Sequence, residues 1–237
     1  WAGMKRTKEE FKTSFRHRTF GASFESEDYA FIDALDKPVA LWTNVLLEEG
    51  IHRNSLVHRE NVIEQHVMDL PDFNDKGAWA EKYADRLENI SEQSENLKKV
   101  KKILSKLKSQ DATNQYTIAI YEQVGALVEY NFKALKKIEA FDLAITADEE
   151  MKILFELQEL IQKFGTFRQE FEKVYSQSRI LNKPENYILD QDHHNHPANQ
   201  SVNFDWQFIS EILFLEKVNT HFKTKTVWQE GTNTILN

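Results

Sequence analysis

The chain has 237 residues and a mass of 27.9 kDa, which suits one large domain or two small ones. Hydrophobic residues make up 41% of it and charged residues 29%, while only 7 Gly and 4 Pro argue against an all-β sandwich and against an α/β fold with many short loops. The absence of Cys excludes a disulfide scaffold, Cys-ligated zinc and thiol catalysis, and the net charge of −8 argues against a nucleic-acid partner.

The first third of the chain carries signals for short helices. Thr7 and Glu10 form a capping box that predicts the start of a first helix, and Gly21 predicts its end. Ser26 can cap a second short helix. Pro38 suits the first turn of a third, because proline has no N–H to satisfy there.

Three long amphipathic stripes follow. Apolar residues recur mostly at steps of three and four over residues 78–107, 118–141 and 146–175, and a last helix is expected over 204–222. A helix of roughly 30 residues is about 45 Å long, and short connections between such helices imply antiparallel neighbours. The sequence therefore predicts an all-α fold: an antiparallel bundle of three long helices with shorter N-terminal helices and a C-terminal helix.

We divide the chain into a short-helix N-terminal subregion, residues 1–75, and a long-helix bundle, residues 76–237, which we expect to form one structural unit. The bundle includes a polar loop at 182–203 and the C-terminal helix. The chain opens on Trp1 with no initiator Met and no signal peptide, so either a targeting segment was removed or the chain is cut from a longer one, and we expect the latter. No run approaches 18 apolar residues, so we expect no membrane-spanning helix.

The polar loop contains the sharpest local feature, the run Asp190–His196 with two Asp and three His. These are ligand types for zinc or a related ion, although their spacing matches no metal motif. A surface loop closed by Asx-turns is the favoured explanation of the run, and a loop that meets a ligand or a neighbouring domain is a third interpretation. The candidate contact residues are Tyr187, Asp190, Asp192, His193, His194 and His196, of which the three histidines are the metal candidates.

Two acidic patterns have simpler explanations than catalysis. Glu49 and His52 have the i, i+3 spacing of di-iron bundles, but that architecture needs a second such motif and two further Glu residues, which the sequence lacks. The acids at 148–150 lie where a helix begins, and the helix dipole favours them there.

The lysine run and the tryptophans also favour structural roles. The six lysines between 98 and 108 are expected to be a solvated helix end rather than an anion-binding patch. Trp42, Trp79 and Trp206 have helical spacing among apolar neighbours, which favours core packing over sugar stacking. The sequence contains no P-loop, dinucleotide-binding glycine pattern, nucleophile elbow or zinc-protease helix, and it implies no cofactor.

Several segments resemble one known family. The segment Phe11–Gly21 resembles the region just beyond the catalytic barrel of bacterial family 20 glycoside hydrolases, the β-N-acetylhexosaminidases. Further segments are similar to the C-terminal helical region of such chains, or fit it: Leu70–Asp72, Tyr187–His194, Ala198–Gln200 and Asp205–Trp206.

The resemblance implies a role without catalysis. The family's active site is a (β/α)₈ barrel with an adjacent Asp–Glu pair, and this chain has neither the strands nor the pair in a suitable context, so no catalytic residue carries over. We expect an accessory domain that packs against its own catalytic barrel or a second subunit, in a periplasmic or extracellular protein. The alternatives are a free-standing helical interaction module and, third, a metal-binding protein that uses the histidine loop.

Overall fold

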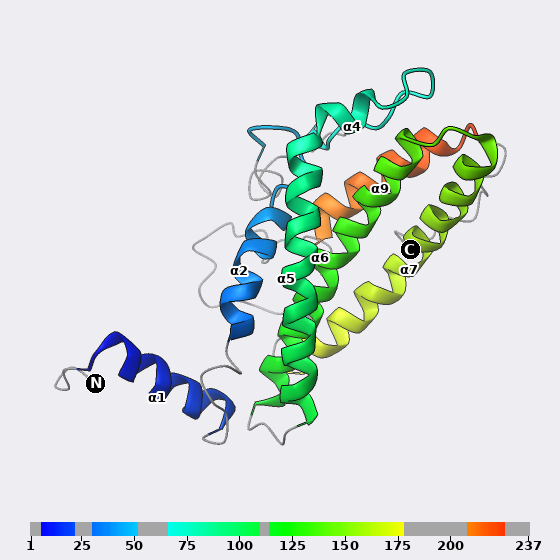
Figure 1. The fold of residues 1–237 in the computed structure, drawn as a ribbon. Coiled ribbons are helices and arrows are strands. Elements are labelled where there is room, and N and C mark those ends of the chain that lie inside the picture. The colour runs from blue at the N-terminus through cyan, green and yellow to red at the C-terminus, as the bar shows by residue number, and fades with distance from the viewer. Residues whose placement is uncertain (1–5, 22–29, 52–65, 110–113, 178–207, 226–237) are drawn as a thin grey trace, which may run out of the picture.

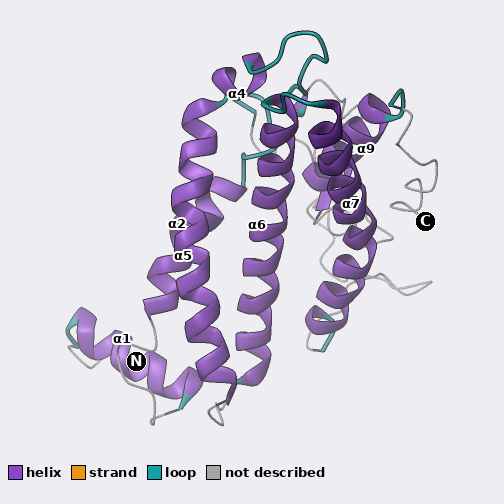
Figure 2. Ribbon diagram, turned by 45° about the vertical axis from the view of Figure 1, so that its right-hand side comes forward, coloured by secondary structure: helices purple, strands orange, loops and turns teal. Residues whose placement is uncertain are grey.

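The structure, a computed structural model, describes residues 6–21, 30–51, 66–109, 114–177 and 208–225. These residues form helices and no strand, so the predicted all-α class is confirmed (Figure 2). Within the same ranges, no helix is both long enough and apolar enough to cross a membrane.

Three long helices form the centre of the fold, as predicted. They are α5 (Ala84–Ser109), α6 (Gln115–Asp142) and α7 (Ala147–Tyr175). Helix α6 packs against α5 on one side and α7 on the other, and successive helices run antiparallel (Figure 1). Because α6 lies between two partners, it buries residues on several faces, whereas α7 forms an edge of the bundle.

Shorter helices cover the centre. Helix α2 (Ala30–Trp42) packs on α5 and α6, and the five-residue α4 (Ala78–Lys82) leads into α5. Helix α9 (Ile209–Phe222) lies against both α6 and α7, because Phe222 meets Phe141 of α6 edge to face at 4.9 Å and Phe208 meets Phe164 of α7 at 5.9 Å.

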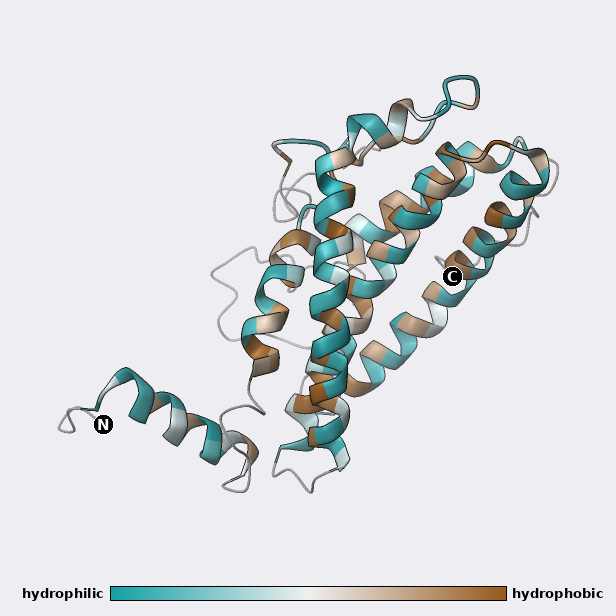
Figure 3. Ribbon diagram, viewed as in Figure 1, coloured by the Kyte–Doolittle hydropathy of each residue, from teal (hydrophilic) through white to brown (hydrophobic). Residues whose placement is uncertain are grey.

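A continuous apolar core joins these elements, and apolar residues gather on the helix faces turned toward one another (Figure 3). Trp79 is 4% exposed and Trp42 packs against the same core, so both are core residues, as predicted. Trp206 lies outside the described residues. Large aromatic rings dominate the core, namely Phe20, Phe31, Phe132, Phe141, Phe164, Phe208, Phe214 and Phe222.

Helix α1 (Lys8–Phe20) has the predicted boundaries. The Thr7 side chain accepts from the Glu10 amide at 3.2 Å, and Glu10 accepts from the Thr7 amide at 2.7 Å. Gly21 ends the helix with φ 114°, a conformation that a residue with a Cβ rarely adopts. Phe20 anchors the end of α1, because it is buried edge-on against Phe31 at 6.1 Å, and the helix projects from the bundle (Figure 1).

The structure corrects two predicted boundaries. Pro38 does not begin a helix but lies inside α2, where it shares a buried face with Phe31 and Leu35. Burial of this face compensates for the backbone hydrogen bond that proline removes. The predicted helix over 78–107 is interrupted at Tyr83, the C-cap of α4. The proposed cap Ser26 lies outside the described residues.

Candidate functional site

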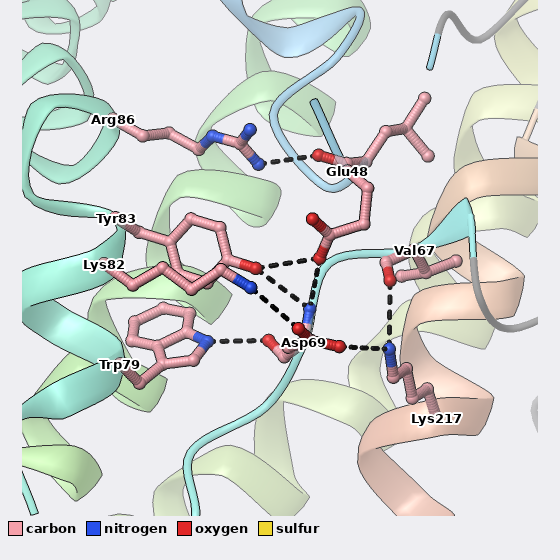
Figure 4. Close-up of polar contacts among 9 residues, drawn as sticks. Glu48, Val67, Asp69, Trp79, Lys82, Tyr83, Arg86 and Lys217 are labelled. Atoms are coloured by element: carbon pink, nitrogen blue, oxygen red, sulfur yellow. Dashed lines mark hydrogen bonds and ion pairs between the residues drawn. The ribbon is translucent and has the colours of Figure 1, made fainter. Parts of the chain in front are cut away.

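The densest polar arrangement lies where two chain segments meet α4, α5 and α9. Residues 43–51 and 66–73 run past each other, with an antiparallel bridge between Leu47 and Val67. The backbone amide of Met68 donates to Leu46 O at 3.0 Å, and that of Glu48 donates to His66 O at 3.1 Å. We call the side chains that hold these segments the polar cluster: Glu48, Asp69, Trp79, Lys82, Tyr83, Arg86 and Lys217 (Figure 4).

Tyr83 is at the centre of the polar cluster. Its hydroxyl donates to Glu48 Oε1 at 2.8 Å and accepts from the Asp69 amide at 3.1 Å, while the same amide donates to Glu48 Oε1 at 2.8 Å (Figure 4). Burial is the main cause that raises the pKa of the Tyr83 hydroxyl. The tyrosine therefore stays protonated near neutral pH and acts as a fixed hydrogen-bond donor.

Asp69 connects α4 with α9 through its side chain and backbone. Its Oδ2 accepts from Lys82 Nζ at 2.7 Å, Lys217 Nζ lies 3.6 Å from Oδ1, and its carbonyl accepts from Trp79 Nε1 at 2.6 Å. The hydrogen bond from Lys82 is the largest cause that lowers the pKa of Asp69, and the same bond raises the pKa of Lys82. Both groups are therefore charged at neutral pH.

Arg86 completes the polar cluster from α5. One of its guanidinium nitrogens donates to Leu47 O at 2.8 Å and to Val45 O at 3.1 Å. The Arg86 guanidinium thus satisfies two backbone carbonyls of the segment 43–51, which is not part of a regular β-ladder. The pKa values of Tyr83 and Lys82 are raised and that of Asp69 is lowered, which suits a structural latch.

A second arrangement is buried between α2, α6 and α9. The Glu211 carboxylate is fully buried, and its Oε1 accepts from Trp42 Nε1 at 2.9 Å and from Asn131 Nδ2 at 2.8 Å. Burial, and then the charge of Glu211, raises the pKa of Tyr130. The carboxylate therefore ties three helices together within the core.

Two surface features expose large apolar side chains. On α1, Phe11 is 50% exposed and Phe15 52% exposed, and their rings stack with centroids 6.4 Å apart. On α7, Met151 and Phe155 are 40% and 46% exposed. A shallow hollow of about 100 Å³ on α1 is lined by Arg6, Phe11, Ser14, Phe15 and Arg18.

The predicted loop residues cannot be compared with these sites. The candidates Tyr187, Asp190, Asp192, His193, His194 and His196 all lie outside the described residues, as does the loop 182–203. Among the residues that the structure does describe, no three His, Asp or Glu side chains lie together as a metal site would need. Glu49 lies in an exposed turn, and its proposed partner His52 is outside the described ranges.

The acids at the start of α7 have the structural roles that their position predicts. The carboxylate of Glu149 accepts from the amides of Ile145 and Thr146 in a capping box, and these bonds lower its pKa. Glu150 pairs with Lys76 at 2.8 Å and with Lys225 at 3.6 Å. Both acids are thus engaged in holding the helix start.

The lysine run at the end of α5 forms ion pairs at the surface. Lys101 pairs with Glu129 of α6, and Lys108 Nζ lies 2.9 Å from Glu122 of the same helix. Lys98 pairs within α5 with Glu95 at 2.6 Å. This agrees with the predicted solvated helix end.

Sequence analysis missed the polar cluster because its members are far apart in the chain. Glu48 and Tyr83 are 35 residues apart, and no short motif joins them. Glu211 did leave a signal, since it is an acid inside the otherwise apolar stripe of α9. A charged residue on a buried face indicates a partner elsewhere in the fold.

The chain matches no protein-family model, and no curated protein or solved structure is significantly similar to it. The fold and the geometry of its sites are therefore the basis on which a function is proposed.

Proposed function

We propose that this chain is a non-catalytic helical accessory module that supports a neighbouring domain through helix α1. The observation that carries the proposal is the exposed stack of Phe11 on Phe15, half-exposed on a helix that projects from the bundle. Exposed apolar groups next to polar ones mark interaction sites. On the basis of the resemblance to family 20 glycoside hydrolases, we take the neighbouring domain to be the catalytic barrel of an exported glycoside hydrolase that acts on N-acetyl-amino-sugar glycosides.

The shape of α1 supports docking. Phe11 and Phe15 are one turn apart, so both can enter one hydrophobic surface, and Arg6 and Arg18 flank them beside the hollow. Burying the exposed halves of two phenylalanines stabilises a contact by about 2–3 kcal/mol. That is enough to orient a covalently linked neighbour, because a linked domain is already at high effective concentration.

The polar cluster supports a role without chemistry. Its groups bond to one another and to backbone carbonyls, and Asp69, Lys82 and Tyr83 have pKa values shifted in the directions that fix their charge states. The latch gives the bundle a fixed shape on which a neighbouring domain can rest.

The first test is the reading frame upstream of the Trp1 codon. We expect about 250 or more residues with alternating strands and helices and an Asp–Glu pair at a strand end. We also expect the isolated chain not to hydrolyse nitrophenyl N-acetylglucosaminide. An initiation codon directly before Trp1 would favour the free-standing interaction module, and turnover by the isolated chain would overturn the non-catalytic assignment.

The docking helix is tested in the full-length protein. Phe11→Ser with Phe15→Ser should lower the thermal midpoint at which the barrel loses activity, because the barrel loses its contact with α1. Leu143→Ser, which changes a comparably exposed apolar residue (55%) at the end of α6, is the matched control and should leave that midpoint unchanged. Equal effects of the two changes would refute docking through α1.

A further inference from the structure

Helix α7 presents an outward face along the edge of the bundle. Successive residues of an α-helix are 100° apart, so the members of this face lie within one stripe about a third of the circumference wide. Every residue of this outward face is exposed to solvent. We call them the α7 stripe: Asp148, Met151, Lys152, Phe155, Glu159, Gln162 and Lys163.

The centre of the α7 stripe is apolar. Met151 and Phe155 are 40% and 46% exposed and lie one helical turn apart. Ile145, in the turn before α7, is also exposed, at 93%. Helix α7 itself lies at the edge of the bundle, with α6 as its neighbour (Figure 1).

Charged residues of the α7 stripe lie at equal distances on either side of its centre, and the two members of each such pair have opposite signs. Going along the helix, Asp148 is negative, Lys152 positive, Glu159 negative and Lys163 positive. If a second α7 lies antiparallel with its centre opposite residues 155–156, Lys152 of one copy meets Glu159 of the other. Asp148 then meets Lys163, and Phe155 lies beside its own counterpart.

Every charge in this arrangement faces the opposite sign, and the two-fold axis makes each pair occur twice. A two-fold axis perpendicular to the helices keeps Lys152 and the facing Glu159 on the same side of the contact, because both lie on the same flank of the stripe. A parallel pairing in register would instead place each residue against its own copy and bring like charges together.

We propose that the α7 stripe is a self-complementary surface that binds the same stripe of a second copy in antiparallel orientation, which makes the chain a two-fold homodimer. This surface is separate from α1, so the proposal does not depend on the neighbouring barrel. Charge complementarity sets the register, and the Met151 and Phe155 side chains supply the apolar contact.

The size of the surface makes the dimer a weak one. A single helix pair buries less than the ~800 Å² per partner of a standard stable interface. The dissociation constant is therefore expected in the range of roughly 10 µM to 1 mM. The existing pair between Glu159 and Lys163 is long, at 3.9 Å, and both side chains are about 70% exposed, so little is lost when they re-pair across the dimer.

The test is a charge reversal and its compensation, measured by sedimentation equilibrium of the 237-residue chain at about 5 µM to 1 mM. Lys152→Glu faces Glu159 of the second copy at two symmetric positions, so the dissociation constant should rise about tenfold. Glu159→Lys should do the same. The double variant with both changes restores opposite charges and should return to within about twofold of the original value.

Two further variants separate the surface from general effects. Phe155→Ala should weaken the dimer about tenfold, because it removes the central apolar contact. Lys99→Glu, an equal change of net charge at an exposed position of α5, should leave it unchanged. Circular dichroism confirms that each exposed-site variant remains helical.

The outcomes are decisive. Association that is weakened by each single reversal and restored by the double variant supports the antiparallel stripe. A monomer at every concentration overturns the proposal. So does a dimer that ignores the single reversals, or one that the double variant fails to restore.

Discussion

The Tyr83 hydroxyl gives the sharpest test of the polar cluster as a structural latch. Tyr83→Phe keeps the ring, which is buried, and removes one oxygen that donates to Glu48 at 2.8 Å and accepts from the Asp69 amide at 3.1 Å. Both bonds of the hydroxyl are lost, but the Asp69 amide keeps its bond to Glu48 and is not left unpaired. We expect a loss of about 1–2 kcal/mol in the free energy of unfolding.

The measurement is urea unfolding monitored by circular dichroism, with thermal unfolding beside it. A loss of this size lowers the melting temperature by about 3–6 °C in a chain of this length. Tyr116→Phe is the matched control, because it removes the same atom from a longer bond to a neutral carbonyl, Tyr175 O at 3.3 Å. It should cost about 0.5 kcal/mol or less.

A double-mutant cycle identifies the partner. Glu48→Ala combined with Tyr83→Phe should cost about 1 kcal/mol less than the sum of the single changes, because each single change removes the bond between the Tyr83 hydroxyl and Glu48. If Tyr83→Phe costs no more than Tyr116→Phe, or if the two changes are additive, the polar cluster does not latch the segment and the reasoning fails.

Two further predictions concern α9 and α7. His221 is half-buried beside Pro71 O, Asp72, Lys217 and Lys225, and burial is the main cause that lowers its pKa. The unfolded chain therefore binds more protons than the folded one at mildly acidic pH. Stability is lost as the pH falls from about 6.5, the pKa of an unperturbed histidine, toward the lower pKa of the folded state. In urea unfolding between pH 5 and 7.5, His221→Gln should show a smaller loss; equal slopes would contradict this. Thr146→Ala should cost about 1 kcal/mol by removing the cap of α7, whereas Thr→Ala at the exposed position 166 should cost less in the same assay; equal costs would argue against the cap.

The long helices could be predicted from the chain because their signals are local. The apolar stripes over 118–141 and 146–175 correspond to α6 and α7 within a few residues, and the capping box at Thr7 begins α1 as expected. Spacing of three and four residues and a cap are properties of neighbouring residues, so no knowledge of the fold is needed.

The polar cluster could not be predicted in the same way. Asp69 reaches Lys217, which is far away in the chain, and outside the polar cluster Trp42 likewise reaches the buried Glu211 across 169 residues. Such pairs form only when the helices pack, because no local rule states which acid meets which base. Pro38 shows the same limit, since its local preference for a helix start gave way to burial within α2.

The sequence by itself determined the class of fold, because composition and helical periodicity leave an amphipathic bundle as the way to bury its apolar faces. Tertiary structure decided which faces stay open. Phe11 and Phe20 lie on the same short helix, yet Phe20 is buried against Phe31 and Phe11 is half-exposed. Both are equally apolar in the sequence, and only the position of the neighbouring helices distinguishes the core residue from the exposed one.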